Sequence, residues 1–175
     1  MKKYLILASL ILVFIPNLNK ESEEIIIPDE AIRFRVVAES NTKEDQETKT
    51  IVKEVLEEDL TILLKDSTSI DETRTILKEN QNHFESLVER TLLTNKINTG
   101  YKVNFGINYF PEKNYKGVIY EEGYYESLVV TLGSGNGENW WCVLFPPLCL
   151  MEGEDNNTDE VEYKSFVKEM IDKYL

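Results

Sequence analysis

The spacing of apolar residues changes along this chain of 175 residues, and that change limits the folds open to it. Between residues 52 and 92, apolar residues recur every three or four positions, which predicts two helices separated by a break at Ser67–Ile70. From Tyr101 to Tyr109, apolar and polar residues alternate, which is the period of a strand with one buried face. A segment with the helical period does not form a stable strand, and a segment with the strand period does not form a stable helix. The chain must therefore combine helices with strands.

Other segments extend this pattern and give a fold class. Residues 32–36 alternate apolar residues with arginine, which predicts a half-buried strand. Residues 117–120 and 124–132 flank a short glycine-bearing connection, which predicts a β-hairpin. A final amphipathic helix begins at about Glu160. We therefore predict a single α+β domain: a mainly antiparallel sheet covered by two central helices and, on its open face, by the C-terminal helix.

The N-terminus has the features of an export signal. Lys2 and Lys3 precede an apolar run from Tyr4 to Ile15, well short of the roughly 20 apolar residues that span a bilayer. No small-residue cleavage site follows the run, so a cleaved signal and a retained anchor both stay open. We predict an export signal or signal anchor over residues 1–20, a polar connector over 21–30 and an extracytoplasmic domain over 31–175.

The charge of the chain limits its partners. It carries 19 Lys and Arg against 32 Asp and Glu, a formal net charge of −13. Nucleic acid and anionic lipid are bound mainly by Lys and Arg that neutralise phosphate. We therefore expect no nucleic-acid partner, and contact with a membrane only through the N-terminal segment.

Few residues could support metal binding or catalysis. His83 is the only histidine and there are two cysteines, whereas a structural zinc site needs about four such ligands. No motif joins a nucleophile, a base and an orienting group. We therefore expect no metal, no cofactor and no enzymatic activity, although a hydrolase with paired carboxylates stays open as an alternative.

The most unusual segment runs from Gly133 to Cys149 and reads GSGNGENWWCVLFPPLC. Its alternating glycines permit a backbone path that side chains forbid, and Glu138 stands where a phosphate loop needs a lysine. In an extended strand, Trp140 and Trp141 point to opposite faces. Either both indoles fill the core, or one anchors a protein partner. We predict a partner-binding site made of Asn139, Trp140, Trp141, Phe145, Pro146 and Pro147.

Cys142 and Cys149 are the only cysteines, and an exported location permits them to form a disulfide. The bond would close a loop of about 8 residues and contribute roughly 2.5 kcal/mol by the chain-entropy estimate. Two buried thiols are the alternative. We predict that the two cysteines pair.

The run NWWCVLFPPLC resembles the hallmark of the stage II sporulation protein R family. The likeness extends over most of the chain from about Glu30 to Cys149. Besides the glycine loop, it includes IRFRVVA at 32–38, Ser40, the Asp45-Gln46 pair, Lys49, residues 110–115, and Gly123, Tyr125, Glu126 and Leu128. The sequence departs from the family at Glu39 and Asn41, in the predicted strand-to-helix turn.

This resemblance implies a function. Members of the family are exported from the forespore into the space between the two membranes of a sporulating cell. There they act on a membrane-embedded aspartic protease of the mother cell, which cleaves the precursor of the early mother-cell sigma factor. We therefore expect a secreted signalling protein, with an exported cell-wall hydrolase or a structural spore-envelope protein as alternatives. A deep cleft lined by carboxylates would favour the enzyme, and a shallow apolar patch around Trp140 or Trp141 the signal.

Overall fold

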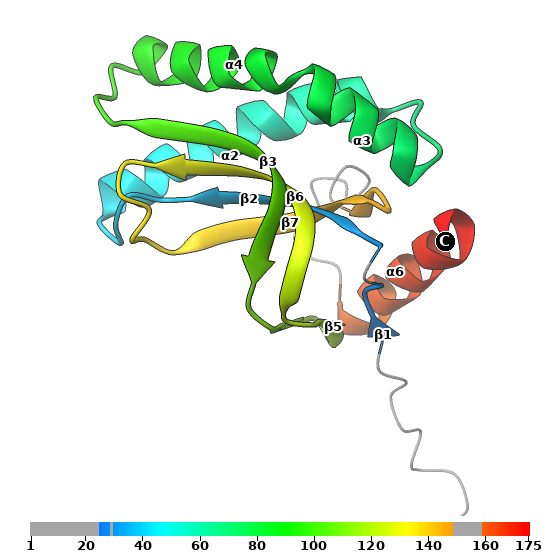
Figure 1. The fold of residues 1–175 in the computed structure, drawn as a ribbon. Helices are drawn as coiled ribbons and strands as arrows, with labels where there is room; N and C mark the ends of the chain where they lie inside the picture. The colour runs from blue at the N-terminus through cyan, green and yellow to red at the C-terminus, as the bar shows by residue number, and fades with distance from the viewer. Residues whose placement is uncertain (1–24, 29, 149–158) are drawn as a thin grey trace, which may run out of the picture.

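The computed structural model describes residues 25–28, 30–148 and 159–175. A four-stranded sheet lies beneath three helices, and a smaller sheet lies beside the C-terminal helix (Figure 1). The predicted export segment, residues 1–20, lies outside the described residues. Within the part of the chain that is described, no helix has both the length and the apolar character needed to span a membrane.

The helices in chain order are α2 (Lys43–Leu64), α3 (Ile70–Glu79), α4 (Gln81–Thr94) and α6 (Glu160–Tyr174). The strands are β1 (Ile25–Ile26), β2 (Ile32–Val37), β3 (Tyr101–Phe110), β4 (Lys113–Tyr115), β5 (Val118–Tyr120), β6 (Gly123–Leu132) and β7 (Asn139–Phe145). The chain is therefore an α+β domain, as its sequence predicts.

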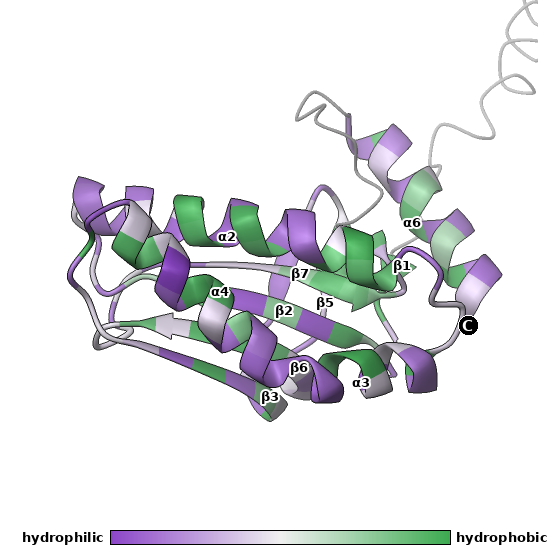
Figure 2. Cartoon of the chain, turned by 90° about the horizontal axis from the view of Figure 1, so that it is seen from above, coloured by the Kyte–Doolittle hydropathy of each residue, from purple (hydrophilic) through white to green (hydrophobic). Residues whose placement is uncertain are grey.

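The long helix α2 begins where the sequence offers two possible caps, Asn41 and Thr42. Thr42 is the N-cap, and its hydroxyl accepts a hydrogen bond from the Asp45 amide at 3.3 Å. The apolar stripe that the spacing predicts is buried against the sheet: Val52, Leu56, Leu60 and Leu64. Figure 2 shows the corresponding alternation of hydrophobic and hydrophilic bands along α2.

The second predicted helix is two helices, so the prediction of one continuous element was wrong. The chain leaves helical geometry at Asn80 (φ −100°, ψ 13°), which separates α3 from α4. The Asn80 side chain donates to the Ile76 carbonyl at 2.9 Å. Because only one residue is non-helical, the apolar spacing continues through the break from Leu77 to Phe84, and both residues are fully buried.

The larger sheet has the order β3-β6-β2-β7. Two of its ladders are antiparallel, β3 with β6 and β2 with β7. The central ladder, β2 with β6, is parallel. Helices α2, α3 and α4 lie over one face of this sheet (Figures 1 and 2).

The predicted hairpin between residues 117–120 and 124–132 is also wrong. Strand β5 pairs with β4 and with β1 to form the smaller sheet. Lys116 and Gly117 join β4 to β5, and both have positive φ (48° and 73°), as a tight two-residue turn requires. Strand β6 instead pairs with all ten residues of β3, which is a much longer ladder than β5 offers.

Strand β2 is buried on both faces, although its alternating arginines predict one exposed face. Arg33 is fully buried. Aromatic rings surround its guanidinium carbon, which lies 3.4 Å from the ring centroid of Tyr125, 5.3 Å from that of Phe110 and 5.6 Å from that of Trp141. These cation–π contacts and the apolar stem allow an arginine to occupy a position that the alternation assigns to solvent.

The C-terminal helix completes a second apolar cluster, on the face of the larger sheet that carries Arg33 and Trp141. Its residues Tyr163, Val167 and Met170 are buried together with Val118 of β5 and Val143 of β7. The Tyr163 and Tyr120 hydroxyls are hydrogen-bonded at 2.7 Å. Helix α6 therefore covers apolar surface, as its sequence predicts, and it does so where the two sheets meet.

Candidate functional site

The predicted partner-binding residues Asn139, Trp140, Trp141 and Phe145 lie on β7, at one edge of the larger sheet, and Pro146 and Pro147 follow directly after the strand. Asn139 is exposed, and Trp140, Trp141 and Pro147 are half-buried. Phe145 and Pro146 are buried, and the peptide bond between them is cis. Because Phe145 and Pro146 are buried, the surface of the predicted site comes from Asn139, Trp140, Trp141 and Pro147.

The two indoles lie on opposite faces of β7, as an extended strand predicts. Trp140 lies on the side of α2, edge-on to Phe34 with the ring centroids 5.5 Å apart. The Lys53 ammonium lies 5.3 Å from the centroid of the Trp140 ring. Trp140 therefore contributes to the core and keeps part of its surface in solvent.

Trp141 packs on the other face, against Phe110 and Tyr120 at centroid distances of 5.7 and 5.3 Å. The Lys113 ammonium lies 5.1 Å from its ring centroid. The two interpretations of the tryptophans therefore do not exclude each other, since each indole fills core and retains exposed surface. The lysines beside the rings come from α2 and β4, and no local spacing in the sequence marks them.

The glycine-rich loop packs tightly against the turn between β2 and α2. The Gly137 amide donates to the Ala38 carbonyl and the Asn136 amide to the Glu39 carbonyl, both at 3.0 Å. A Cβ on Gly137 would lie 2.3 Å from the Ser40 carbonyl oxygen, so only glycine fits this approach. The loop is therefore a structural junction.

A polar network continues this junction into α2. The Glu138 amide donates to the Asn41 side chain at 2.6 Å. The Lys49 ammonium donates to Gln46 Oε1 at 2.6 Å and to the Glu138 carbonyl at 3.3 Å. Burial lowers the pKa of Lys49 and nearby Lys113 lowers it further, while Glu138 acts in the opposite direction. The network positions the start of β7, and with it Trp140.

These contacts bring together segments that are far apart in the sequence. The turn after β2, the first turns of α2, the glycine loop and the start of β7 all meet at one end of the sheet. They are among the segments on which the family resemblance rests.

Comparison with known proteins tests that resemblance directly. The family model for stage II sporulation protein R matches residues 28–155. The chain belongs to this family. It is 35% identical over 158 residues to stage II sporulation protein R of Bacillus subtilis (strain 168), an alignment that covers 90% of this chain and 70% of the relative. No solved structure matches the chain.

Membership of the stage II sporulation protein R family supports a role in sporulation. The residues that match the family model include β7 and the segments that meet at its start: the turn after β2, the first turns of α2 and the glycine loop. The predicted disulfide lies partly outside the described residues: Cys142 is half-buried on β7 opposite Phe34, whereas Cys149 is not described. The pairing of the two cysteines stays a prediction.

The single histidine of this family member has a structural partner. His83 Nε2 lies 2.9 and 3.0 Å from the two carboxylate oxygens of Asp59, and the pair joins α4 to α2 near the surface. Among the described residues, no group of three His, Cys, Asp or Glu side chains is arranged to hold a metal ion.

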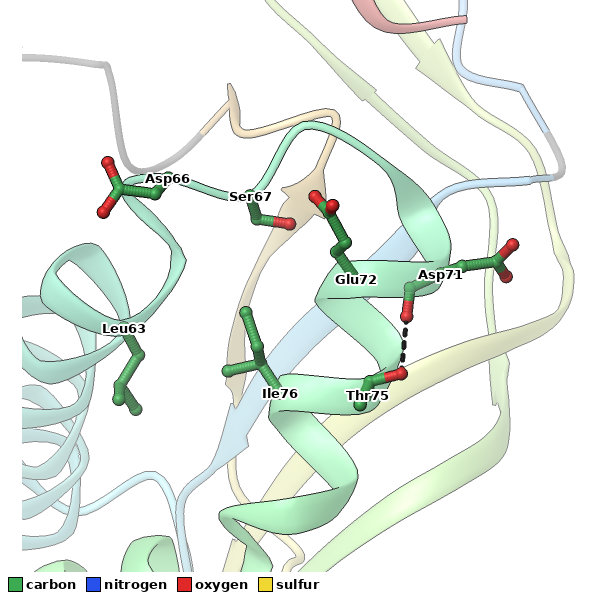
Figure 3. Close-up of a pocket in the computed structure, with 7 residues that line it drawn as sticks. All are labelled: Leu63, Asp66, Ser67, Asp71, Glu72, Thr75 and Ile76. Carbon is green, nitrogen blue, oxygen red and sulfur yellow. Dashed lines mark hydrogen bonds between the residues drawn. The ribbon is translucent and has the colours of Figure 1, made fainter.

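A pocket of about 400 Å³ lies between the end of α2 and the start of α3 (Figure 3). It is lined by Leu63, Asp66, Ser67, Asp71, Glu72, Thr75 and Ile76. A general acid in a glycosidase needs a raised pKa, but hydrogen bonds from the Thr68 backbone and hydroxyl lower the pKa of Glu72. Asp71 pairs with Arg74, and Figure 3 shows it pointing away from Asp66. Asp71 and Glu72 lie in the first turn of α3, and the hydrogen bonds to Glu72 favour its charged form over a proton-donating acid.

Proposed function

We propose that this member of the family is an exported sporulation signal that activates a membrane-embedded aspartic protease by binding its extracytoplasmic face. The signal is made in the forespore and acts in the space between the forespore and mother-cell membranes. The activated protease, in the mother cell, then processes the precursor of the early mother-cell sigma factor. Activation is a binding event in which this chain performs no chemistry.

The family match carries the sporulation part of this proposal. The geometry of β7 supports the binding part. Asn139, Trp140 and Trp141 present polar and aromatic surface from a strand that is already fixed by its ladder with β2 and by the glycine-loop junction. A surface ordered before binding loses little entropy on association, and tryptophan is enriched at binding hot spots.

The experiment is a complementation assay in a sporulating host that lacks its own copy of the gene, with processing of the sigma-factor precursor as the readout. Asn139→Arg places a long charged side chain at the exposed start of β7 without disturbing the core. Trp141→Ala truncates the indole, and loss of a hot-spot tryptophan typically costs at least about 2 kcal/mol, near a thirtyfold loss of affinity. Both variants should reduce processing.

The matched control is Ile62→Arg, because Ile62 is 64% exposed on α2 and lies nine residues beyond Lys53, the α2 residue beside Trp140. This control should process the precursor like the wild type. Each purified variant is also unfolded thermally, since Trp141 contributes to packing. Normal processing by a folded Asn139→Arg protein would refute contact at this site, and normal processing in cells without the gene would refute the function itself.

The hydrolase alternative makes a different prediction in the same assay. Glu72→Gln removes the carboxylate that the pocket of Figure 3 would need as an acid. We expect Glu72→Gln to leave processing unchanged at neutral pH. Loss of processing by this variant, with normal folding, would favour an enzyme over a binding signal.

A further inference from the structure

A second surface, at the opposite edge of the sheet from β7, exposes three large side chains. Ile107 is 67% exposed, Tyr109 46% and Tyr124 76%. Tyr109 and Tyr124 are directly opposite each other in the β3–β6 ladder, with ring centroids 5.6 Å apart, and Ile107 lies on the same face two residues along β3. We call these three residues the tyrosine patch.

The tyrosine patch contradicts the alternation that predicts a fully buried face for β3. Val103, on the same face, is buried against the helices. Figure 1 shows the arrow end of β3 and the start of β6 extending beyond the helical layer. Helix α3 reaches this end of the ladder through Arg74, which pairs with Glu126 opposite Ile107, and the three side chains of the patch stay largely exposed beside it. Large apolar side chains gathered on a surface are typical of an interaction site.

The shape of the partner follows from the edge beside the patch. Strand β3 pairs with β6 on one side, and no strand of the described chain pairs with its other side. Over its ten residues β3 contains no proline and one charged residue, Lys102. Edge strands usually carry proline or several charges that prevent further pairing. An edge without them suits an extended segment that adds as another strand.

The charge of the partner follows from the groups around the patch. Glu122 accepts a hydrogen bond from the Tyr109 hydroxyl at 3.0 Å. Glu126, opposite Ile107 in the ladder, and Asp71 of α3 share one cation, Arg74. Two carboxylates therefore share one guanidinium, and Glu122 adds a third negative charge beside Tyr109. The second cation near the patch is Arg35, which donates to the Tyr109 carbonyl at 3.3 Å, so the carboxylates stay in excess. This excess of negative charge attracts a basic segment and opposes anionic lipid headgroups.

We propose that the tyrosine patch and the free edge of β3 bind an extended segment of a partner protein in which apolar residues alternate with lysine or arginine. The apolar side chains contact Ile107, Tyr109 and Tyr124, and the basic side chains face Glu122 and Asp71. Backbone hydrogen bonds to β3 hold the segment in register. This surface is separate from β7, so the proposal does not depend on contact between Trp141 and the protease.

The test is a selection from random peptides of 10 residues, the length of β3, on the purified full-length protein. Peptides that also bind the Ile107→Thr/Tyr124→Thr double variant are removed. The recovered peptides should alternate apolar with basic residues. A synthetic peptide with the strongest recovered sequence should lose at least about tenfold in affinity on the double variant. Its affinity should be unchanged on Ile62→Thr, a control at a similarly exposed isoleucine.

Folding is not expected to confuse this result, because the two replaced side chains are mostly exposed and threonine suits a strand. A copy of the peptide with methylated backbone nitrogens tests the strand geometry and should bind poorly. The proposal is overturned if no peptide is recovered, if the recovered peptides are acidic or uncharged, or if the methylated copy binds equally well. Self-association of the wild type that the double variant abolishes would also overturn it, because the occupant would then be a second copy.

Discussion

The contact between Gly137 and the turn after β2 allows a sharp test of the junction that supports β7. In Gly137→Ala, the new Cβ would lie 2.3 Å from the Ser40 oxygen, 2.6 Å from the Ser40 carbonyl carbon and 2.9 Å from the Ala38 Cβ. Two of these three atoms belong to the backbone, so a side-chain rotation cannot relieve the clash. The loop must move away from the turn.

The cost of this movement has two parts. Overpacking of this kind costs about 1–3 kcal/mol, and the bond from the Gly137 amide to the Ala38 carbonyl contributes about 1 kcal/mol more if it is lost. A total of about 3 kcal/mol should lower the thermal midpoint by about 6–12 °C in a domain of this size.

The assay is thermal unfolding followed by circular dichroism, with Gly100→Ala as the matched control. A Cβ on Gly100 meets no atom within 4 Å. The control should therefore be as stable as the wild type, or slightly more stable because alanine restricts the unfolded chain. Equal midpoints for Gly137→Ala and Gly100→Ala would show that the loop does not pack against the turn as described.

Three further predictions concern other parts of the chain. Hydrogen bonds lower the pKa of Glu72 below its ordinary value of 4.5, so its stabilisation exists above that pH and is lost as the pH falls through the folded pKa. The wild type should therefore unfold at higher urea than Glu72→Gln at about pH 7, and the difference should shrink as the pH falls below 4.5 and through the folded pKa; a difference that stays constant over this range would exclude the charge as its source. Cys142 and Cys149 in denatured, unreduced protein should resist alkylation, and two modified thiols would reject the pairing. A periplasm-type reporter fused after Leu175 should be active, whereas activity of a cytosol-only reporter there would contradict export.

The elements that local spacing could predict are those with one covered face. The stripe from Val52 to Leu64 predicts α2 correctly. The run from Trp140 to Phe145 is continuously apolar, and only the assumption of an extended strand placed Trp140 and Trp141 on opposite faces, which the structure confirms. Arg33 was predicted to face solvent because spacing carries no information about what lies opposite a residue. The aromatic rings around it come from β3, β5, β6 and β7.

Pairing between strands was the least predictable feature. The glycine-bearing connection Glu121-Glu122-Gly123 favours a hairpin between β5 and β6, but the longer ladder between β3 and β6 determines the pairing. At the candidate site, the sequence pointed to the tryptophans through the family motif. It could not point to Lys53 or Lys113, whose positions beside the rings depend on helix packing and on the smaller sheet.

The central position of β2 also bears on the order in which the domain can form. Phe34 pairs with Leu128 of β6 on one side and with Cys142 of β7 on the other, so both neighbours of the strand are synthesised long after it. Contacts between residues so distant in sequence form slowly because a long loop must close first. The sheet therefore cannot close until residue 145 has been made. On the proposed export route, the N-terminus can engage the translocation machinery while the chain behind it is still unfolded and able to thread through.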